Sequence, residues 1–143
     1  MPREIQDILK YVRTALPAQN TTAQSASIDL EQTPADSVNE VIDVIIRLPA
    51  TPNLANGQTI TFSIQDSADN SSFATVAGTG SFVVTGAGGN GGPAFPVAAI
   101  PNSPGMPHFK LPPQTRRYIR AQVVTSATAG DNTAVFYTFQ LGF

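Results

Sequence analysis

The chain contains no cysteine and no tryptophan, and it has only one histidine among its 143 residues. Without cysteine there can be no disulfide, no thiolate ligand for zinc or an iron–sulfur cluster, and no thiol nucleophile. The single histidine, His108, cannot build a two-histidine metal site, and any histidine-dependent catalytic triad would have to include it. The composition therefore excludes disulfides, metal centres built on cysteine or on two histidines, and thiol nucleophiles.

Charged residues are also scarce, at 13% of the chain, which is about half of the share in an average globular protein. Ten acidic residues outnumber eight lysines and arginines, and the formal net charge at pH 7 is −2. A protein that neutralises many phosphates needs a basic surface, so the charge argues against nucleic acid as a partner. The apolar runs are too short to cross a bilayer, and the charged N-terminus does not resemble a secretory signal. We therefore expect no membrane partner, and synthesis in the cytoplasm.

Proline and glycine, in contrast, are plentiful, and from residue 25 onward apolar residues recur with a period of two. The clearest case is the segment 59–65, where Ile60, Phe62 and Ile64 alternate with polar residues. Roughly eight strands with a turn signal about every 8–12 residues predict an all-β fold, an antiparallel β-sandwich, with a jelly roll favoured over an immunoglobulin-like topology. The predicted strands are 27–30, 38–48, 59–65, 73–76, 81–85, 95–100, 108–111, 118–125 and 133–141.

Residues 1–24 are predicted to form an N-terminal arm ahead of the sandwich domain at 25–143. The apolar residues between 2 and 16 follow the spacing of one stripe of an amphipathic helix, which Pro17 would end. An extended arm is the alternative. A helix of this length is marginal in isolation, so its stripe must pack either on its own domain or on a neighbouring subunit. In the second case the partner-binding residues are Ile5, Ile8, Leu9 and Val12.

Two short segments are candidates for a chemical site. The glycine loop 86–92 lacks the Lys-Ser/Thr ending and the following helix of a phosphate-binding loop, so we interpret it as a flexible hairpin loop. Asp66, Asp69 and Asn70 offer side-chain oxygens of the kind that bind calcium, but the glycine and the closing glutamate of a calcium loop are missing, and a polar turn is favoured. Nothing near His108 indicates a nucleophile or an orienting carboxylate. We expect no enzyme activity, no cofactor and no metal.

The only dense cluster of cations consists of Arg116, Arg117 and Arg120, with Lys110 nearby. One interpretation is a solvated beginning of a strand. The other is a set of guanidinium groups that pair with carboxylates, either in the same domain or on another subunit. The second interpretation makes the three arginines candidates for partner binding.

The same cluster lies in a segment that is similar to part of a known family. Residues 111–120, Leu-Pro-Pro-Gln-Thr-Arg-Arg-Tyr-Ile-Arg, resemble a recurring segment of the capsid cement (decoration) proteins of tailed bacteriophages. Residues 61–73 resemble that family's strand followed by Gln-x-Ser-x-Asp and Phe, and residues 23–30 resemble its small-residue run ending in Ile-Asp-Leu. The resemblance covers about residues 23–143 in order. It departs from the family at Pro113-Gln114, where a glycine is expected, and in the longer helical start.

The resemblance implies a jelly-roll protein on the outside of an icosahedral shell, where it bridges neighbouring subunits of the major capsid protein. Such a protein is made in the host cytoplasm, is located on the capsid exterior of the virion, and is a homo-oligomer such as a dimer or trimer. The N-terminal arm and selected loops would make the subunit contacts. The alternative function is a receptor- or glycan-binding β-sandwich of a phage fibre or tail tip, although no repeat or fibre segment is present in the sequence.

Overall fold

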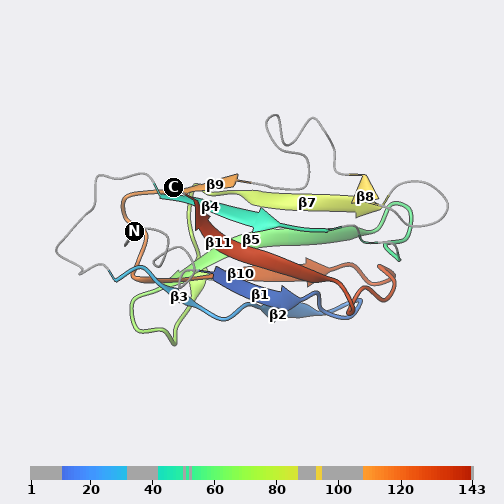
Figure 1. The fold of residues 1–143 in the computed structure, drawn as a ribbon, viewed down its shortest axis with the longest axis horizontal. Coiled ribbons are helices and arrows are strands. Elements are labelled where there is room, and N and C mark those ends of the chain that lie inside the picture. Colours follow the sequence, from blue (N-terminus) through green and yellow to red (C-terminus); the bar gives the residue numbers. More distant parts are fainter. Residues whose placement is uncertain are drawn as a thin grey trace.

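The structure is a computed structural model that describes residues 11–31, 42–49, 51, 53–86, 93–94 and 108–142. Within these ranges the regular elements are strands, and none of the residues belongs to a helix long and apolar enough to cross a membrane. The strands form two antiparallel sheets that pack face to face (Figure 1). The predicted antiparallel β-sandwich is confirmed.

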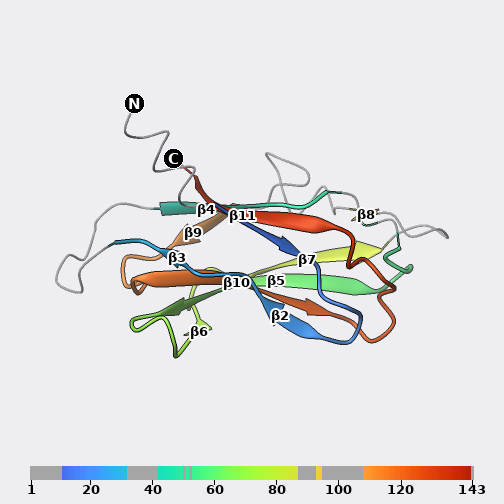
Figure 2. The same cartoon turned by 60° about the horizontal axis from the view of Figure 1, so that its bottom comes forward.

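Figure 2 shows the two sheets as separate layers. Sheet A contains, in spatial order, β1 (Tyr11–Ala15), β11 (Phe136–Gly142), β4 (Ile42–Arg47) and β9 (His108–Leu111). Sheet B contains β2 (Thr22–Gln24), β10 (Tyr118–Thr125), β5 (Thr59–Ser67), β7 (Ser81–Gly86) and β8 (Pro93–Ala94). Two short strands lie off this path: β3 (Ile28–Asp29) pairs with β10, and β6 (Ala74–Thr75) pairs with β5.

The order of the strands makes most hydrogen-bonded neighbours distant in sequence. β11, the last strand, lies between β1 and β4, and β10 lies between β2 and β5. The chain changes sheet between β1 and β2, between β3 and β4, between β4 and β5, between β8 and β9, and at both connections from β9 to β11. This interleaving agrees with the jelly-roll topology that the strand number favours.

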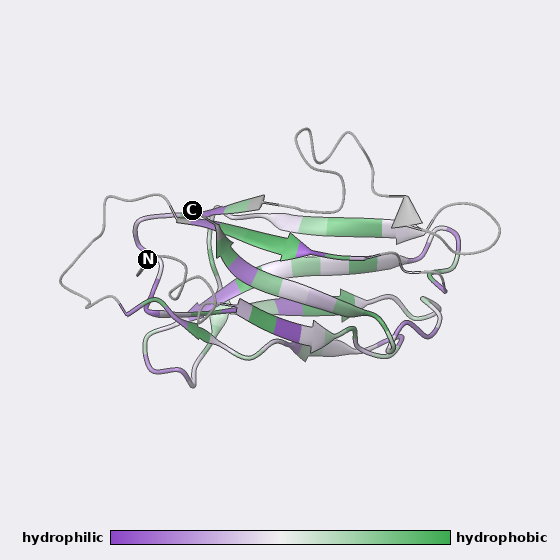
Figure 3. Cartoon of the chain, viewed as in Figure 1, coloured by the Kyte–Doolittle hydropathy of each residue, from purple (hydrophilic) through white to green (hydrophobic). Residues whose placement is uncertain are grey.

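Apolar and polar residues alternate along the strands (Figure 3), and the buried apolar side chains form the core between the sheets. Ile60, Phe62 and Ile64 are buried, as the sequence predicts. Phe62 of sheet B packs edge-on against Tyr137 of sheet A, with ring centroids 5.3 Å apart. Burial of each such side chain stabilises the fold by roughly 1.5–3 kcal/mol. The inner faces of β10 and β11 add Ile119, Ala121, Val123, Tyr137, Phe139 and Leu141.

The predicted helix over residues 2–16 is wrong for the part that the structure describes, because residues 11–15 form strand β1. Val12 and Leu16 are four residues apart, a spacing that fits one face of a helix and also one face of a strand. Pairing with β11 decides between them, and the Leu16 N–H donates a further hydrogen bond of 2.8 Å to the Val135 carbonyl. Residues 2–10 lie outside the described residues.

The predicted boundary between arm and sandwich at residue 24 also needs correction. β1 is a strand of sheet A, and β2 pairs with β10 in sheet B. Residues 11–24 are therefore part of the sandwich and contribute one strand to each sheet. Only residues 1–10 remain as a candidate arm.

The other strand predictions are confirmed where the structure describes them. β5, β7, β9, β10 and β11 lie within two or three residues of their predicted limits. Gly78 and Gly80 have φ of 87° and 72°, which provides the bend predicted between β6 and β7. The predicted strand 95–100 lies outside the described residues.

Candidate functional site

The predicted arginine cluster lies at one end of sheet B, where β9 leads through a turn into β10. The N–H and the hydroxyl of Thr115 both donate to the Pro112 carbonyl, at 3.0 and 2.7 Å, and close the turn. Pro113 and Gln114 are not among the residues with positive φ. The turn therefore does not require the glycine that the cement family has, and Pro113-Gln114 is compatible with it.

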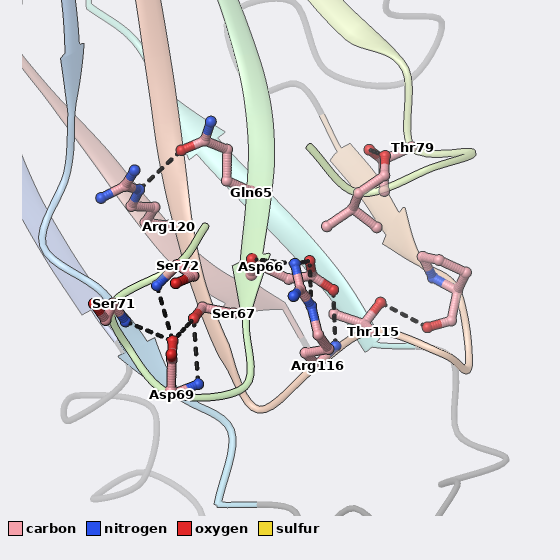
Figure 4. A network of polar contacts seen from close by, with 12 residues as sticks. Gln65, Asp66, Ser67, Asp69, Ser71, Ser72, Thr79, Thr115, Arg116 and Arg120 are labelled. Carbon is pink, nitrogen blue, oxygen red and sulfur yellow. Dashed lines mark hydrogen bonds and ion pairs between the residues drawn. The ribbon is translucent and has the colours of Figure 1, made fainter. Parts of the chain in front are cut away.

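Arg116 makes the most extensive contacts of the cluster, all with Asp66 near the end of β5 (Figure 4). Its Nε and Nη2 donate to Asp66 Oδ1 at 3.0 and 2.6 Å, its backbone N–H donates to Oδ2 at 2.9 Å, and Nη2 also reaches the Asp66 carbonyl at 2.7 Å. These hydrogen bonds raise the pKa of Arg116. Asp66 is buried, so its carboxylate depends on these donors in place of water.

Arg117 makes a bidentate ion pair with Asp29 of β3. Nε donates to Oδ1 at 2.7 Å and Nη2 donates to Oδ2 at 2.8 Å, which is the parallel geometry that a guanidinium and a carboxylate favour. The hydrogen bonds to Asp29 raise the pKa of Arg117 further above its ordinary value. Asp29 Oδ1 also accepts the backbone N–H of Glu31, and the Leu30 N–H donates to the Arg117 carbonyl, so the segment after β3 is tied to β10.

Arg120 differs from the other two because its partners are uncharged. Its Nε donates to Gln65 Oε1 at 2.9 Å, and its guanidinium carbon lies 3.9 Å from the centroid of the Phe73 ring. Burial lowers the pKa of Arg120. A cation over an aromatic face is stabilised by the negative potential of the ring, which compensates part of the lost hydration.

Of the interpretations of this cluster, the one in which the arginines pair with residues of the same domain agrees with the structure. Each arginine contacts a residue that is distant in sequence, and together they connect β3, β5 and the loop before β6 to β10. The side chains of Arg116 and Arg117 remain 40% and 41% exposed. A partner could therefore still reach them, and their role in partner binding stays a prediction.

The Asp66–Asn70 segment forms a polar turn. Asp69 Oδ1 accepts hydrogen bonds from the Ser67 hydroxyl at 2.7 Å and from the N–H groups of Ser71 and Ser72 at 2.9 and 2.8 Å (Figure 4). The hydrogen bonds from Ser72, Ser67 and Ser71 lower the pKa of Asp69 to about 2. Asn70 adopts a φ of 58°, which asparagine tolerates better than most residues.

The predicted arm residues are only partly within the described structure. Ile5, Ile8 and Leu9 lie outside it, as do residues 87–92 of the glycine loop. Val12 lies in β1, is partly buried, and packs against the core of its own sheet pair. For Val12 the structure thus shows the alternative in which the segment packs on its own domain.

A second group of residues was not singled out by the sequence pattern. Tyr11 and Phe136 are 45% and 40% exposed on the outer face of sheet A, where Arg13 and Arg47 are also exposed. The alternation of Tyr11, Val12, Arg13 and Thr14 is the signal that could have found this face. The spacing of the apolar residues fits a helix as well, and the helix was predicted for this segment in place of a strand.

Comparison of the chain with protein-family models finds no match, and comparison with curated proteins finds no significant relative. The functional assignment therefore depends on the site geometry and on the resemblance of its segments.

Proposed function

We propose that this chain is a virion structural protein, a capsid cement (decoration) protein that binds and stabilises the assembled shell of a tailed bacteriophage. One observation is the main support for the proposal. The three segments that resemble the cement family meet at one end of the sandwich, and each arginine of the last segment pairs with a residue of an earlier one. The pairs are Arg117 with Asp29, Arg116 with Asp66, and Arg120 with Gln65 and Phe73.

These contacts support a structural origin of the resemblance. Asp29 and Arg117 are 88 positions apart, and Asp66 and Arg116 are 50 positions apart. β10 pairs with both β3 and β5, so the three segments lie on neighbouring strands and their charged side chains pair across them. The contacts also explain why arginine and aspartate occur at these positions, because the bidentate pairing of a guanidinium group requires a carboxylate at a fixed distance.

The fold suits a passive stabilising role. Two sheets packed over a continuous apolar core form a rigid body, and a rigid body loses little conformational entropy when it binds a surface. A ligand that binds only the assembled lattice stabilises that lattice by mass action. Many copies that contact a symmetric shell, each as a homo-oligomer, reinforce one another through multivalent binding to the major capsid protein.

The decisive experiment measures the protein on purified virus particles. Particles separated on a density gradient are expected to contain hundreds of copies, and a cryo-EM map is expected to show β-sandwich density on the capsid exterior. Particles that lack the protein should release DNA at a lower temperature or after a milder osmotic shock, and adding the purified protein should restore resistance. Protein found only free in the lysate, or particles equally robust without it, would contradict the proposal.

The candidate arm has its own test. Deletion of residues 1–17 would remove β1 and expose β11, so the test is restricted to deletion of residues 1–10. If Ile5, Ile8 and Leu9 contact a neighbouring subunit, this deletion weakens binding to shells and leaves the urea unfolding midpoint unchanged. Unchanged binding with a lower midpoint would place the segment on its own domain.

A further inference from the structure

The outer face of sheet A differs in charge from the rest of the described surface. Arg13 of β1 and Arg47 of β4 lie on either side of Thr138 in one row across three strands. Adjacent strands are about 4.8 Å apart, so the two arginine backbones are roughly 10 Å apart. Neither arginine makes an ion pair with a described residue, in contrast to Arg116 and Arg117.

The remaining charges on this face do not balance the arginines. Lys110 of β9 is exposed on the same face, and the one carboxylate there, among the described residues, belongs to Asp43 of β4. Counted over the described residues, the face carries three cations against one anion, in a chain whose formal net charge is −2. Concentration of positive charge on one face of an acidic protein favours an acidic partner surface.

Two exposed aromatic residues flank the arginines along the strands. Tyr11 pairs with Gln140 at one end of β1, and Phe136 pairs with Ala15 at the other, roughly 13 Å away. Tyrosine, phenylalanine and arginine are enriched at protein–protein interfaces, and a face with all three has the composition of a contact surface. The two central rows of the outer face of sheet B carry no charge and consist of Thr22, Val124, Thr61 and Val83 and of Gln24, Gln122, Ser63 and Ser81. The arginine and aromatic residues of that face, Tyr118, Arg120 and Phe73, lie toward one end, where Arg120 is partly buried against Gln65 and Phe73.

The geometry argues against two other occupants. Two copies that met through this face around a two-fold axis would bring Arg13 and Arg47 of both chains together, which like-charge repulsion opposes. A sugar ring would need the open face of an aromatic residue. The guanidinium carbon of Arg13 lies 4.1 Å from the centroid of the Phe136 ring and occupies one face of it, which leaves Tyr11 as the one exposed aromatic residue of this described surface without a described cation over its ring.

We propose that the outer face of sheet A, centred on Arg13 and Arg47, is the surface that docks on the capsid shell, and that the shell surface opposite it is acidic. This inference rests on the proposed function. It adds which face of the sandwich is used and what chemistry the major capsid protein presents to it.

The test compares two double variants that change the net charge equally. Arg13→Gln with Arg47→Gln removes two charges from sheet A, and Gln24→Glu with Ser81→Glu adds two negative charges to the exposed outer face of sheet B. Both are mixed with expanded shells that lack the protein, and binding is measured by co-sedimentation at several salt concentrations. The sheet A variant is expected to bind at least about tenfold more weakly, with a smaller dependence on salt, and the sheet B variant is expected to bind like the parent.

A footprinting experiment on the unmodified protein gives an independent readout. Hydroxyl radicals label exposed side chains, and Tyr11 and Phe136 are expected to become protected on the shell, whereas Val83 and Val124 remain labelled. Binding of the sheet A variant at parental affinity, or protection of the valines alone, would overturn the inference while the proposed function stands. Failure of the unmodified protein to bind any shell would instead overturn the proposed function. Binding of the unmodified protein to acidic glycans in an array, lost in the sheet A variant, would replace the shell with a glycan as the occupant.

Discussion

Arg117 and Asp29 are joined by two parallel hydrogen bonds of 2.7 and 2.8 Å, although 88 positions separate them in the chain. The contact connects the beginning of β10 to β3, and the neighbouring pair of Arg116 and Asp66 connects the same turn to β5. The end of the sandwich is therefore held together by charged side chains, whereas its centre is held by apolar packing around Phe62 and Tyr137.

Asp66→Asn is expected to reduce the free energy of unfolding by about 1–3 kcal/mol. The amide has one acceptor oxygen, and it places an N–H₂ group against the donors of Arg116. The half-exposed Arg116 side chain keeps part of its hydration, which limits the loss. Urea denaturation measures the effect.

Arg116→Lys provides the comparison, because lysine keeps the positive charge but lacks the planar set of N–H donors of the guanidinium group. Its unfolding midpoint should lie between those of the parent and Asp66→Asn. An unchanged midpoint for Asp66→Asn would show that these contacts contribute nothing to stability.

Asp69 should make the protein less stable in acid. Its pKa is about 2 in the folded state against 3.8 for a free side chain, so the folded state binds the proton less readily. The stabilisation is present above pH 3.8 and is lost as the pH falls toward 2. Asp69→Asn keeps an acceptor oxygen for the turn, and it should remove this part of the acid dependence.

Asp69→Ala removes the acceptor as well, and it should lower the unfolding midpoint at every pH. Urea titrations of the three proteins at several acidic pH values separate the two effects. An acid dependence that is the same in the parent and in Asp69→Asn would assign it to other carboxylates.

Tyr137 should make the fold sensitive to alkali. Burial raises its pKa to about 12 from 10.0, although a hydrogen bond with Thr14 acts in the opposite direction. The folded state therefore keeps the phenol proton that the unfolded chain loses, and stability is complete below pH 10 and declines as the pH rises toward 12. Tyr137→Phe should remove this decline, at a cost of about 1 kcal/mol at neutral pH for the lost hydrogen bond.

The ultraviolet absorbance of tyrosinate follows the same group directly. In the parent protein the absorbance is expected to show an ionisation step near pH 12 from Tyr137, and this step should be missing in Tyr137→Phe. Absorbance titrations of the folded parent and of Tyr137→Phe that coincide near pH 12 would contradict the prediction.

Gly130 and Gly78 form a matched pair that separates backbone strain from steric exclusion. Both have positive φ, of 81° and 87°, but an added Cβ would lie 2.1 Å from the Asn53 carbonyl oxygen at Gly130 and would meet nothing within 4 Å at Gly78. Gly78→Ala should cost about 1 kcal/mol for the left-handed conformation alone. Gly130→Ala should cost about 2–4 kcal/mol, because the loop containing Asn53 must also move. Equal unfolding midpoints for the two variants would refute the close approach of the two loops.

The sequence by itself determined the fold class and much of the strand pattern. Alternation of Ile60, Phe62 and Ile64 with polar residues is a local property, since successive side chains of a strand point to opposite faces whatever the strand pairs with. The same reasoning placed β10 and the buried residues of β11 correctly. It failed at residues 11–15, where Val12 and Leu16 fit both periods and a neighbouring strand, not local propensity, supplied the backbone partners.

Only the tertiary structure decided which groups meet. The sequence shows three arginines and several scattered carboxylates, but the pairing of Arg116 with Asp66 and of Arg117 with Asp29 follows from the order of the strands in sheet B. The outer face of sheet A arises in the same way, because Arg13 and Arg47 become neighbours in space when β11 inserts between β1 and β4. Periodicity specifies the direction of a side chain relative to its own strand, whereas contacts between distant residues depend on how the strands are arranged.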